Sequence, residues 1–589
     1  MATKLKEVDA VMVGMGWTGP IIARELTKAG LDVVGLERGP DRDPAEEFVI
    51  PRLRDELRYV QRLELMQNNA LDTVTFRNAP AEQALPIRRF GAFLPGEGVG
   101  GTGIHWGALH WRYLPSDFRL RSALAERYGA KAIPADMTIQ DWPVSYAELE
   151  PFYDRFDKLC GVSGKAGNLR GARVEGGNPF EGPRSDEYPN RPIKSGLGPS
   201  MFADAAKQLG YHPFPAPVAT SSAPYTNPEG MTLGACEYCG FCNRTGCEAN
   251  AKASANITVM PALRADPRFS LRTRAFVSRL IYDKAAKRVT GVAYTDMRTG
   301  EEYEQPAELV VLSAFVFGNT QMMLLAGIGE PYDNRTGKGV VGKNYCYQFE
   351  AGADAFFEGK EFNPFIGAPG MGTIIDDFNG ENFDHAGLGF FGGGYINCAS
   401  GGSPPIGGRS LPHGTPRWGS DWKAATAKWY RSVTRFNTQG SVYANRDNFL
   451  DLDPTYKDAL GRPLVRMTYN GTDNDHAMSR YLVAKLEGVI KAMGPTHYDL
   501  HLRPRNFTIV PYQSTHNTGG TMMGADPKSS VVNRYLQAWG AHNLFVMGAS
   551  VFPQQHGYNP TGTVGALAYW SANAITTQYL KKPGPLVHA

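Results

Sequence analysis

Four cysteine residues lie within twelve positions of a chain of 589 residues that contains only seven. They form the run "CEYCGFCNRTGC", at Cys236, Cys239, Cys242 and Cys247. Thiolates bind soft metal ions, and a spacing of two residues is common to structural zinc sites and iron–sulfur clusters. Three cysteines in succession at this spacing favour an iron–sulfur cluster. Structural zinc and an incidental grouping are the alternatives.

A glycine motif near the N-terminus has the pattern of a dinucleotide-binding turn. The short apolar run at 8–13 predicts a buried strand, and it leads into GxGxxG, formed by Gly14, Gly16 and Gly19. A stretch with helical spacing follows, and a second apolar run ends at Glu37. The glycines would let the backbone approach a pyrophosphate, and Glu37 would accept hydrogen bonds from a ribose. NAD and FAD both fit this βαβ unit.

A second glycine-rich segment, "PGEGVGGTGIHWGALHWR" at 95–112, mixes glycines with bulky aromatic residues. Glycine costs conformational entropy, so this density indicates backbone that lies directly against a ligand. A glycine-rich surface loop is the alternative. The pattern continues at 516–524, 546–553 and 557–575, where Pro560 suits the first turn of a helix whose amides could face a flavin. No Asp, Glu, Lys or Arg occurs from Tyr535 to Leu580, which indicates chain that runs through the interior.

Composition argues against several classes of function. The formal net charge of +3 is small against 61 basic and 58 acidic residues, and no long basic tract is present, so nucleic acid is not an expected partner. Apolar stretches are interrupted well before the roughly 20 residues that cross a bilayer. The N-terminus does not have the pattern of a signal peptide, because its apolar run carries Asp9 and leads into the glycine motif.

These glycine-rich blocks, together with "ELVVLSAFVFGNTQMMLLAGIG" (308–329) and "GVVGKNYCYQ" (339–348), resemble the glucose–methanol–choline (GMC) oxidoreductase family along the whole chain. The resemblance implies an α/β fold in which a Rossmann-like FAD-binding domain is interrupted by an α+β substrate domain. The FAD-binding domain would comprise residues 1–125, 225–345 and 505–580, with the cysteines in a loop at 236–247. The substrate domain would comprise residues 126–224 and 346–504.

The resemblance also implies which residues act in the site. His516 matches the catalytic histidine of the family, and Asn559 matches a position that holds His or Asn in relatives. Alcohol oxidation needs a base for the hydroxyl proton, and histidine suits that task because its ordinary pKa is near neutral. His556 is the fallback candidate. The residues expected to contact FAD are Gly14, Gly16, Gly19, Glu37, Gly100, Gly101, Thr102, His105, Trp106, Gly107, Val277, Ala549, Asn559, Pro560 and Thr561.

Within the family, the cysteine cluster makes the chain most similar to the flavoprotein subunits of bacterial membrane-bound gluconate 2-dehydrogenases and related sugar-acid and polyol dehydrogenases. That resemblance implies oxidation of D-gluconate to 2-keto-D-gluconate and a [3Fe-4S] cluster that passes electrons to a multihaem cytochrome c subunit. It also implies a small subunit that carries the export signal, and a location on the periplasmic face of the inner membrane. His105 would either link the flavin covalently through its 8α carbon or pack beside it.

Several alternatives stay open at this point. The same machinery would also suit 2-ketogluconate, a polyol, a sugar or a glycoside. An oxygen-using GMC oxidase and a non-redox GMC lyase are rival functions. An anionic substrate requires a cation in the pocket, and the candidates in the substrate domain are Arg409, Arg417, Lys423 and Arg431. The segment 417–436, with interleaved aromatic and basic residues, predicts an amphipathic helix.

Overall fold

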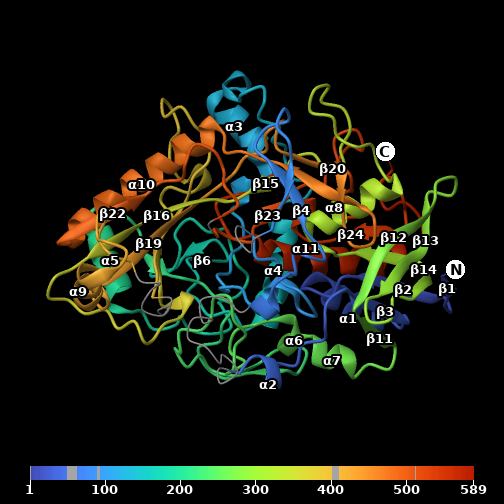
Figure 1. The fold of residues 1–589 in the computed structure, drawn as a ribbon, viewed down its shortest axis with the longest axis horizontal. Coiled ribbons are helices and arrows are strands. Elements are labelled where there is room, and N and C mark those ends of the chain that lie inside the picture. Colours follow the sequence, from blue (N-terminus) through green and yellow to red (C-terminus); the bar gives the residue numbers. More distant parts are fainter. Residues whose placement is uncertain (1, 50–62, 89–92, 401–409, 511, 589) are drawn as a thin grey trace.

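The computed structural model describes residues 2–49, 63–88, 93–400, 410–510 and 512–588. Two large β-sheets lie toward opposite ends of the molecule, and helices and long connections surround them (Figure 1). Both chain termini lie toward the end that contains the first sheet (Figure 1). The architecture is therefore α/β, with one sheet on each side of the region where a ligand can be held.

The first sheet has eight strands, drawn from three distant parts of the chain. β2 (Val8–Val13) lies between β3 (Val33–Glu37) and β14 (Glu302–Leu312), and these three strands run parallel. β24 (Leu544–Val546) also pairs in parallel with β14. Their apolar residues are buried, as expected for strands inside a parallel sheet. The other strands are β1 (Thr3–Lys4), β11 (Phe269–Thr273), β12 (Ala275–Asp283) and β13 (Arg288–Asp296).

Helix α1 (Thr18–Lys28) connects β2 to β3 and completes the βαβ unit that the sequence predicts. Gly14 follows β2 with a φ of 96°, a conformation that favours glycine. A Cβ atom at Gly19 would lie only 2.2 Å from the carbonyl oxygen of Gly14. Glycine at position 19 therefore lets the helix approach the turn closely, which is one of the roles of the third glycine in such motifs.

The uncharged segment that ends at Leu580 runs through the interior, as its composition predicts. It forms β24 and helix α11 (Thr561–Ala574), and most of its side chains are buried. α11 packs against α1 and against α4 (Tyr146–Cys160), while α8 (Phe315–Ala326) follows β14. A charged side chain in this segment would have to lose its hydration without a partner.

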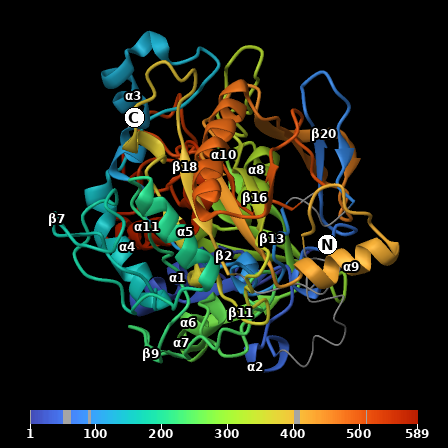
Figure 2. The same cartoon turned by 90° about the vertical axis from the view of Figure 1, so that its left-hand side faces the viewer.

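The second sheet is antiparallel, with six strands in the order β22, β16, β19, β18, β17 and β8. Helices α10 (Asp473–Met493) and α5 (Leu197–Gln208) pack against one face (Figure 2). Because strand side chains alternate, the neighbouring residues point to the opposite face. The strands are β8 (Phe214–Pro215), β16 (Phe349–Phe356), β17 (Thr373–Ile375), β18 (Gly394–Cys398), β19 (Val433–Gly440) and β22 (His497–His501).

A smaller sheet pairs β4 (Val74–Arg77) in parallel with β21 (Pro463–Thr468). It also contains β5 (Leu85–Pro86) and β20 (Phe449–Lys457). Other short elements are α2 (Pro44–Glu47), α3 (Leu120–Tyr128), α7 (Met260–Arg264), β6 (Asn168–Leu169), β7 (Ala172–Arg173) and β9 (Tyr225–Thr226). Within the described ranges, no helix is both long enough and apolar enough to cross a membrane.

The prediction of a helix over 417–436 is wrong after Trp429. Helix α9 covers Gly419–Trp429, and strand β19 begins at Val433. The β-branched residues Val433 and Thr434 favour a strand and pair with β16. Hydrophobic spacing alone did not reveal this change of element, because it depends on a partner strand far away in the sequence.

Candidate active site

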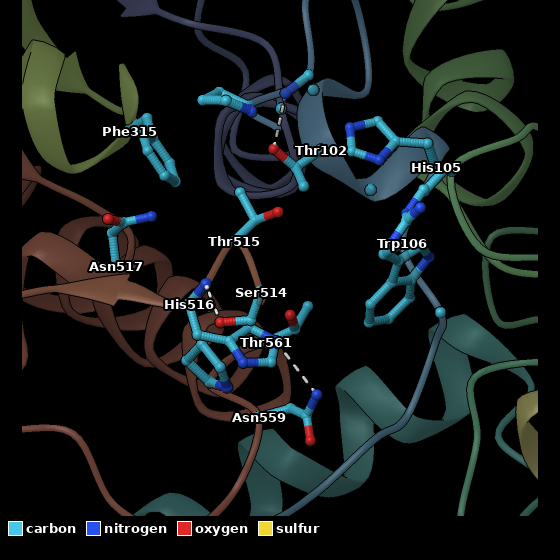
Figure 3. Close-up of a pocket in the computed structure, with 18 of the residues that line it drawn as sticks. Thr102, His105, Trp106, Phe315, Ser514, Thr515, His516, Asn517, Asn559 and Thr561 are labelled. Carbon is cyan, nitrogen blue, oxygen red and sulfur yellow. Dashed lines mark hydrogen bonds between the residues drawn. The ribbon is translucent and has the colours of Figure 1, made fainter. Parts of the chain in front are cut away.

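A cavity of about 810 Å³ is lined by residues from the first sheet and from the open face of the second sheet. Its lining includes every residue that the sequence analysis assigned to FAD except Gly19, which packs behind the turn instead. His516 and Asn559 lie across the cavity from His105 and Trp106 (Figure 3). The fold thus brings five separate glycine-rich segments of the chain to one site.

The first glycine turn leaves room for a phosphate group. A Cβ atom added at Gly16 would meet no atom within 4 Å, so this position opens into free space. The carboxylate of Glu37 lies beside the turn and accepts the N–H groups of Met15 and Gly39, each at 2.9 Å. An ionised carboxylate has about four acceptor sites, so Glu37 retains capacity for ribose hydroxyls. These residues fit the pyrophosphate and ribose of a dinucleotide.

The second glycine segment brings His105 to the cavity wall. Gly100 and Gly101 have φ values of 94° and 52° and start a short 3-10 helix, and Thr102 Oγ1 accepts the N–H of Gly96 at 3.0 Å. His105 is only 2% exposed, and its Nε2 has no hydrogen-bond partner among the described residues. Burial and the nearby Lys252 ammonium lower the pKa of His105 to about 3. This neutral imidazole nitrogen fits either a covalent flavin link or packing beside the ring.

His516 and Asn559 form a pair at the opposite wall. Asn559 Nδ2 lies 3.1 Å from His516 Nε2. At the other end of the amide, Asn559 Oδ1 accepts hydrogen bonds from the Tyr395 hydroxyl and from Gln439 Nε2, each at 3.0 Å. Two donors at Oδ1 fix the orientation of the amide, so its nitrogen must face the histidine. Asn559 therefore donates to His516 Nε2, which must carry a lone pair.

Gln348 fixes the proton on the other nitrogen of His516. Its Oε1 lies 2.5 Å from His516 Nδ1, while its Nε2 donates to the carbonyl oxygens of His556 (3.1 Å) and Tyr558 (3.3 Å). Carbonyl oxygens only accept, so the Gln348 nitrogen must face them and Oε1 must accept the Nδ1 proton. Burial lowers the pKa of His516 to about 3. His516 is thus a neutral imidazole whose Nε2 is available as a base at neutral pH.

The fallback candidate His556 does not line the cavity. Its side chain is 1% exposed, with Nε2 at 3.2 Å from Trp142 Nε1 and Nδ1 at 3.0 Å from Asp117 Oδ1. His556 contributes to the site through its backbone carbonyl, which accepts a hydrogen bond from Gln348.

Three residues of this hydrogen-bond chain carry no sign of their role in the sequence: Gln348, Tyr395 and Gln439. Gln348 lies 168 positions before His516. β15 (Cys346–Tyr347) pairs with β23 (Asn517–Thr518), and this register places Gln348 beside His516. Only the pairing of these short strands reveals the contact.

Replacing Gln348 by leucine is expected to lower kcat about 10- to 100-fold with little change in KM, because the imidazole loses the partner that fixes its tautomer. Gln555 provides a matched control: it is also fully buried, and its Nε2 donates to the same two carbonyls at 3.1 and 2.8 Å. No hydrogen bond joins it to His516 in the described structure, so Gln555→Leu should retain most of kcat. If steady-state assays show the same loss of kcat in both variants, the hydrogen bonds to the two carbonyls support catalysis, and the tautomer of His516 does not depend on Gln348.

The four cysteines lie in one loop between β10 (Thr232–Leu233) and α6 (Ala255–Thr258). Left-handed backbone at Tyr238, Gly240 and Arg244 coils this loop. Burial, together with the charges of the neighbouring thiols, raises the pKa of Cys242 to about 12. In the described part of the chain, no group of three His, Cys, Asp or Glu side chains is arranged to hold a metal ion.

A buried lysine lies against the cysteine loop. Lys252 is 2% exposed, and its Nζ donates to the carbonyl oxygens of Trp106 (2.9 Å), Cys242 (2.5 Å) and Thr245 (2.8 Å). Its backbone N–H lies 3.4 Å from Cys247 Sγ. A buried ammonium is costly without negative charge nearby, and thiolates are anions that this loop can supply. Lys252 therefore joins the cysteine loop to the cavity segment at Trp106 and brings a positive charge close to the thiols.

The cavity contains cations, but they are not the ones proposed from the sequence. Arg417, Lys423 and Arg431 do not line it, and Arg409 lies outside the described residues. Among the residues that the structure describes, the arginines that line it are Arg38, Arg244, Arg435 and Arg462. Spacing in the sequence could not show which basic side chains point inward, because that depends on the path of the loops.

The parallel sheet with its glycine turn and the histidine–amide pair at the cavity define an α/β oxidoreductase of the dinucleotide-binding class. The family model described as GMC oxidoreductase matches residues 200–350 and 444–568. The gluconate 2-dehydrogenase flavoprotein of Pantoea cypripedii is 48% identical over 100% of this chain and 97% of its own length. The chain belongs to the GMC oxidoreductase family, in which FAD is the expected cofactor and CH–OH groups are the electron donors.

Two further comparisons agree with this membership. The fructose dehydrogenase large subunit of Gluconobacter japonicus is 27% identical over 98% of this chain and 99% of its own length. The crystal structure of pyridoxine 4-oxidase from Mesorbium loti is similar with a TM-score of 0.59 and 15% identity, covering 98% of this chain and 100% of that one. The fold is therefore that of the GMC oxidoreductases.

Proposed function

We propose that this protein oxidises a secondary alcohol of a sugar acid, and that conversion of D-gluconate to 2-keto-D-gluconate is the favoured reaction. The observation that carries the proposal is His516, whose Nε2 faces Asn559 without a proton while Gln348 holds the proton on Nδ1. The full-length similarity to a gluconate 2-dehydrogenase flavoprotein supports the choice of substrate. 2-Ketogluconate, polyols, sugars and glycosides are the alternatives to compare in the same flavin-reduction assay.

The geometry supports a chemical role for each of these residues. When bound, FAD supplies the acceptor for the hydride that leaves the substrate carbon. Gly14, Gly16 and Glu37 would hold its pyrophosphate and ribose, and the start of α11 would face its ring system. On binding, the substrate hydroxyl would replace Asn559 as the donor to the single lone pair of His516 Nε2, which then accepts the hydroxyl proton. The Asn559 N–H groups released in this way would donate to the substrate oxygen and orient it.

We assign the substrate carboxylate to Arg244. In gluconate this group is bonded to the reacting C2 carbon, so its partner must lie near His516. The Arg244 guanidinium stacks on the ring of Tyr512 at 4.5 Å, and Tyr512 is four residues before His516. Arg435, which pairs with Asp354 at 3.3 Å, is the cavity arginine to compare with it.

Replacing Arg244 by glutamine is expected to raise KM for gluconate about tenfold or more, since a hydrogen bond to a charged group is lost. KM for the neutral polyol D-glucitol should not change. Arg435→Gln is the control and should leave both values near those of the unaltered enzyme. If KM rises equally for gluconate and D-glucitol, Arg244 stabilises the loop that contains it and does not bind the substrate carboxylate.

A covalent bond between His105 and the flavin 8α carbon is a further part of the proposal. It is supported by His105, which lines the cavity and whose Nε2 atom has no hydrogen-bond partner among the described residues. Acid precipitation of the holoenzyme should leave the flavin on the protein if the bond forms. Release of all the flavin would show that the imidazole only packs beside it.

We place a [3Fe-4S] cluster in the cysteine loop as the exit for electrons. Support comes from the contacts that join this loop to the cavity wall: Arg244 N–H donates to the His105 carbonyl at 2.7 Å, and Lys252 Nζ donates to the Trp106 carbonyl. Electron paramagnetic resonance and metal analysis of anaerobically purified protein test this placement. We expect about three iron atoms per chain, as in a [3Fe-4S] cluster, and a paramagnetic resonance signal that changes when gluconate is added. If the protein contains zinc instead of iron, the proposed electron path through the cysteine loop is wrong, but the proposed alcohol oxidation by flavin is unaffected.

Partner subunits follow from the same proposal. The fructose dehydrogenase relative is by name a large subunit, which supports an assembly for this chain too. We expect a small subunit that carries the export signal and a multihaem cytochrome c subunit that holds the complex on the periplasmic face of the inner membrane. Co-expression and co-purification of the three chains would test the assembly. Peroxide formation during turnover would instead favour an oxygen-using oxidase.

A further inference from the structure

The open face of the second sheet presents polar side chains to the cavity in three rows. Neighbouring strands align Glu350, Gln439 and Tyr395 in the first row. The second row, two residues further along each strand, contains Gly352, Asn437 and Asn397, and the third contains Asp354 and Arg435. The cavity lining includes the side-chain positions of the first row, both asparagines of the second row, and Arg435. The reacting end of the cavity is at the first row, because Gln439 and Tyr395 both donate to Asn559.

The second row is built to bind hydrogen-bonding groups that the protein itself does not supply. Asn397 is 4% exposed, and no described residue donates a hydrogen bond to its Oδ1. A buried amide oxygen without a partner costs free energy, so its retention in the cavity wall points to a ligand or to bound water. Asn437 lies next to it on β19, and its Oδ1 packs against Gly352, where a Cβ atom would come within 3.4 Å of that oxygen.

The spacing of the rows identifies what can reach the second one. Two residues along a strand span about 6.7 Å. Four carbon–carbon bonds of about 1.5 Å separate C2 from C6 of a six-carbon chain, so the extended chain with its terminal hydroxyl covers a similar distance. A six-carbon donor with C2 at His516 would therefore place its last hydroxyls over Asn397 and Asn437. The third row, at about twice that distance, lies beyond it.

We infer that Asn397 and Asn437 form a subsite for the distal hydroxyls of an extended polyhydroxyl chain, and that this subsite makes the enzyme select donors by chain length. This inference rests on the proposed alcohol oxidation and adds the class of donor. Each asparagine offers an N–H group and a carbonyl oxygen, which together match hydroxyls that both donate and accept. Donors that are too short to reach the second row form no hydrogen bond with Asn397 Oδ1, so this subsite does not stabilise their binding.

The test uses the holoenzyme and two series of probes, aldonates and alditols of three to six carbons. Flavin bleaching without oxygen gives kcat/KM for each probe, and isothermal titration gives its affinity. In the unaltered enzyme, kcat/KM should rise about tenfold as the chain becomes long enough to reach the second row, as expected for one or two hydrogen bonds. In Asn397→Leu and in Asn437→Ala this rise should disappear, while values for three-carbon probes stay the same.

Arg435→Gln is the matched control, because its side chain lies in the third row and should not affect chains of up to six carbons. FAD content and Tm are measured for every variant, and Asn437→Ala serves if Asn397→Leu does not fold. Equal losses at every chain length, or no loss at any, would overturn the subsite. If no probe reduces the flavin, the proposed oxidation fails. The titrations then test the subsite separately. The subsite is supported if the affinity for the probes rises with chain length only when both asparagines are present. It is overturned if the affinity of the unaltered enzyme does not rise with chain length.

Discussion

Replacing His516 by alanine is expected to lower kcat/KM for the alcohol donor by about 1,000-fold, which is within the range that a positioned general base contributes. The hydroxyl proton then has no acceptor at the cavity wall, because Asn559 directs an N–H group toward that point. Bound FAD should be retained, since the glycine turns that would hold it lie elsewhere. Rapid mixing of the holoenzyme with gluconate in the absence of oxygen, followed by flavin absorbance, measures the effect.

His556→Gln is the control variant for His516→Ala. His556 is a second buried histidine close in sequence to Asn559, but its ring contacts Trp142 and Asp117 outside the cavity. We expect this variant to keep most of its kcat/KM, although its Tm should fall as the Trp142 contact is lost. A loss below tenfold in His516→Ala, together with a large loss in His556→Gln at unchanged FAD content, would transfer the role of base to His556.

Replacing Cys242 by serine should separate the two halves of the catalytic cycle. Cys242 is the most buried of the four clustered thiols, and a hydroxyl is a much poorer ligand for iron than a thiolate. Flavin reduction by gluconate should stay within a small factor of the unaltered rate. Turnover with a one-electron acceptor such as ferricyanide or cytochrome c should fall about 100-fold, because electrons reach the flavin but leave it slowly.

Cys398→Ser is the matched control for the cluster variant. Cys398 is fully buried in the second sheet, and its Sγ lies 3.5 Å from Thr434 Oγ1, so a serine hydroxyl can take its place. Both half-reactions should survive in this variant. If Cys242→Ser transfers electrons to the acceptor as fast as Cys398→Ser does, the cysteine loop does not carry electrons and another exit must be sought.

Local patterns in the sequence were sufficient to predict the βαβ unit at the start of the chain. The turn at Gly14, the helix after it and the strand that ends at Glu37 form within a few tens of residues, so their spacing determines the unit directly. The interior position of the uncharged segment that ends at Leu580 was predictable for a similar reason, since composition alone decides whether chain can be buried.

The positions of the substrate-side residues depend on strand register and could not be predicted. Gln348 reaches His516 only because β15 pairs with β23, and Asn397 reaches Asn437 only because β18 pairs with β19. A shift of one residue in either pairing would turn these side chains to the opposite face of the sheet. The helix expected over 417–436 failed for the same reason, since pairing with β16 outweighs the local preference for a helix after Trp429.

The pairing of β24 with β14 has a consequence for how the protein is made. β14 is complete at Leu312, but the strand that covers its edge at Val310, Val311 and Leu312 is synthesised more than 200 residues later. Until then a growing chain exposes unpaired N–H and C=O groups, which can pair with other chains. His516 and Asn559 also emerge only near the end of translation. A truncated chain would therefore be aggregation-prone and without its catalytic pair, so cellular quality control should remove it before it can compete for flavin.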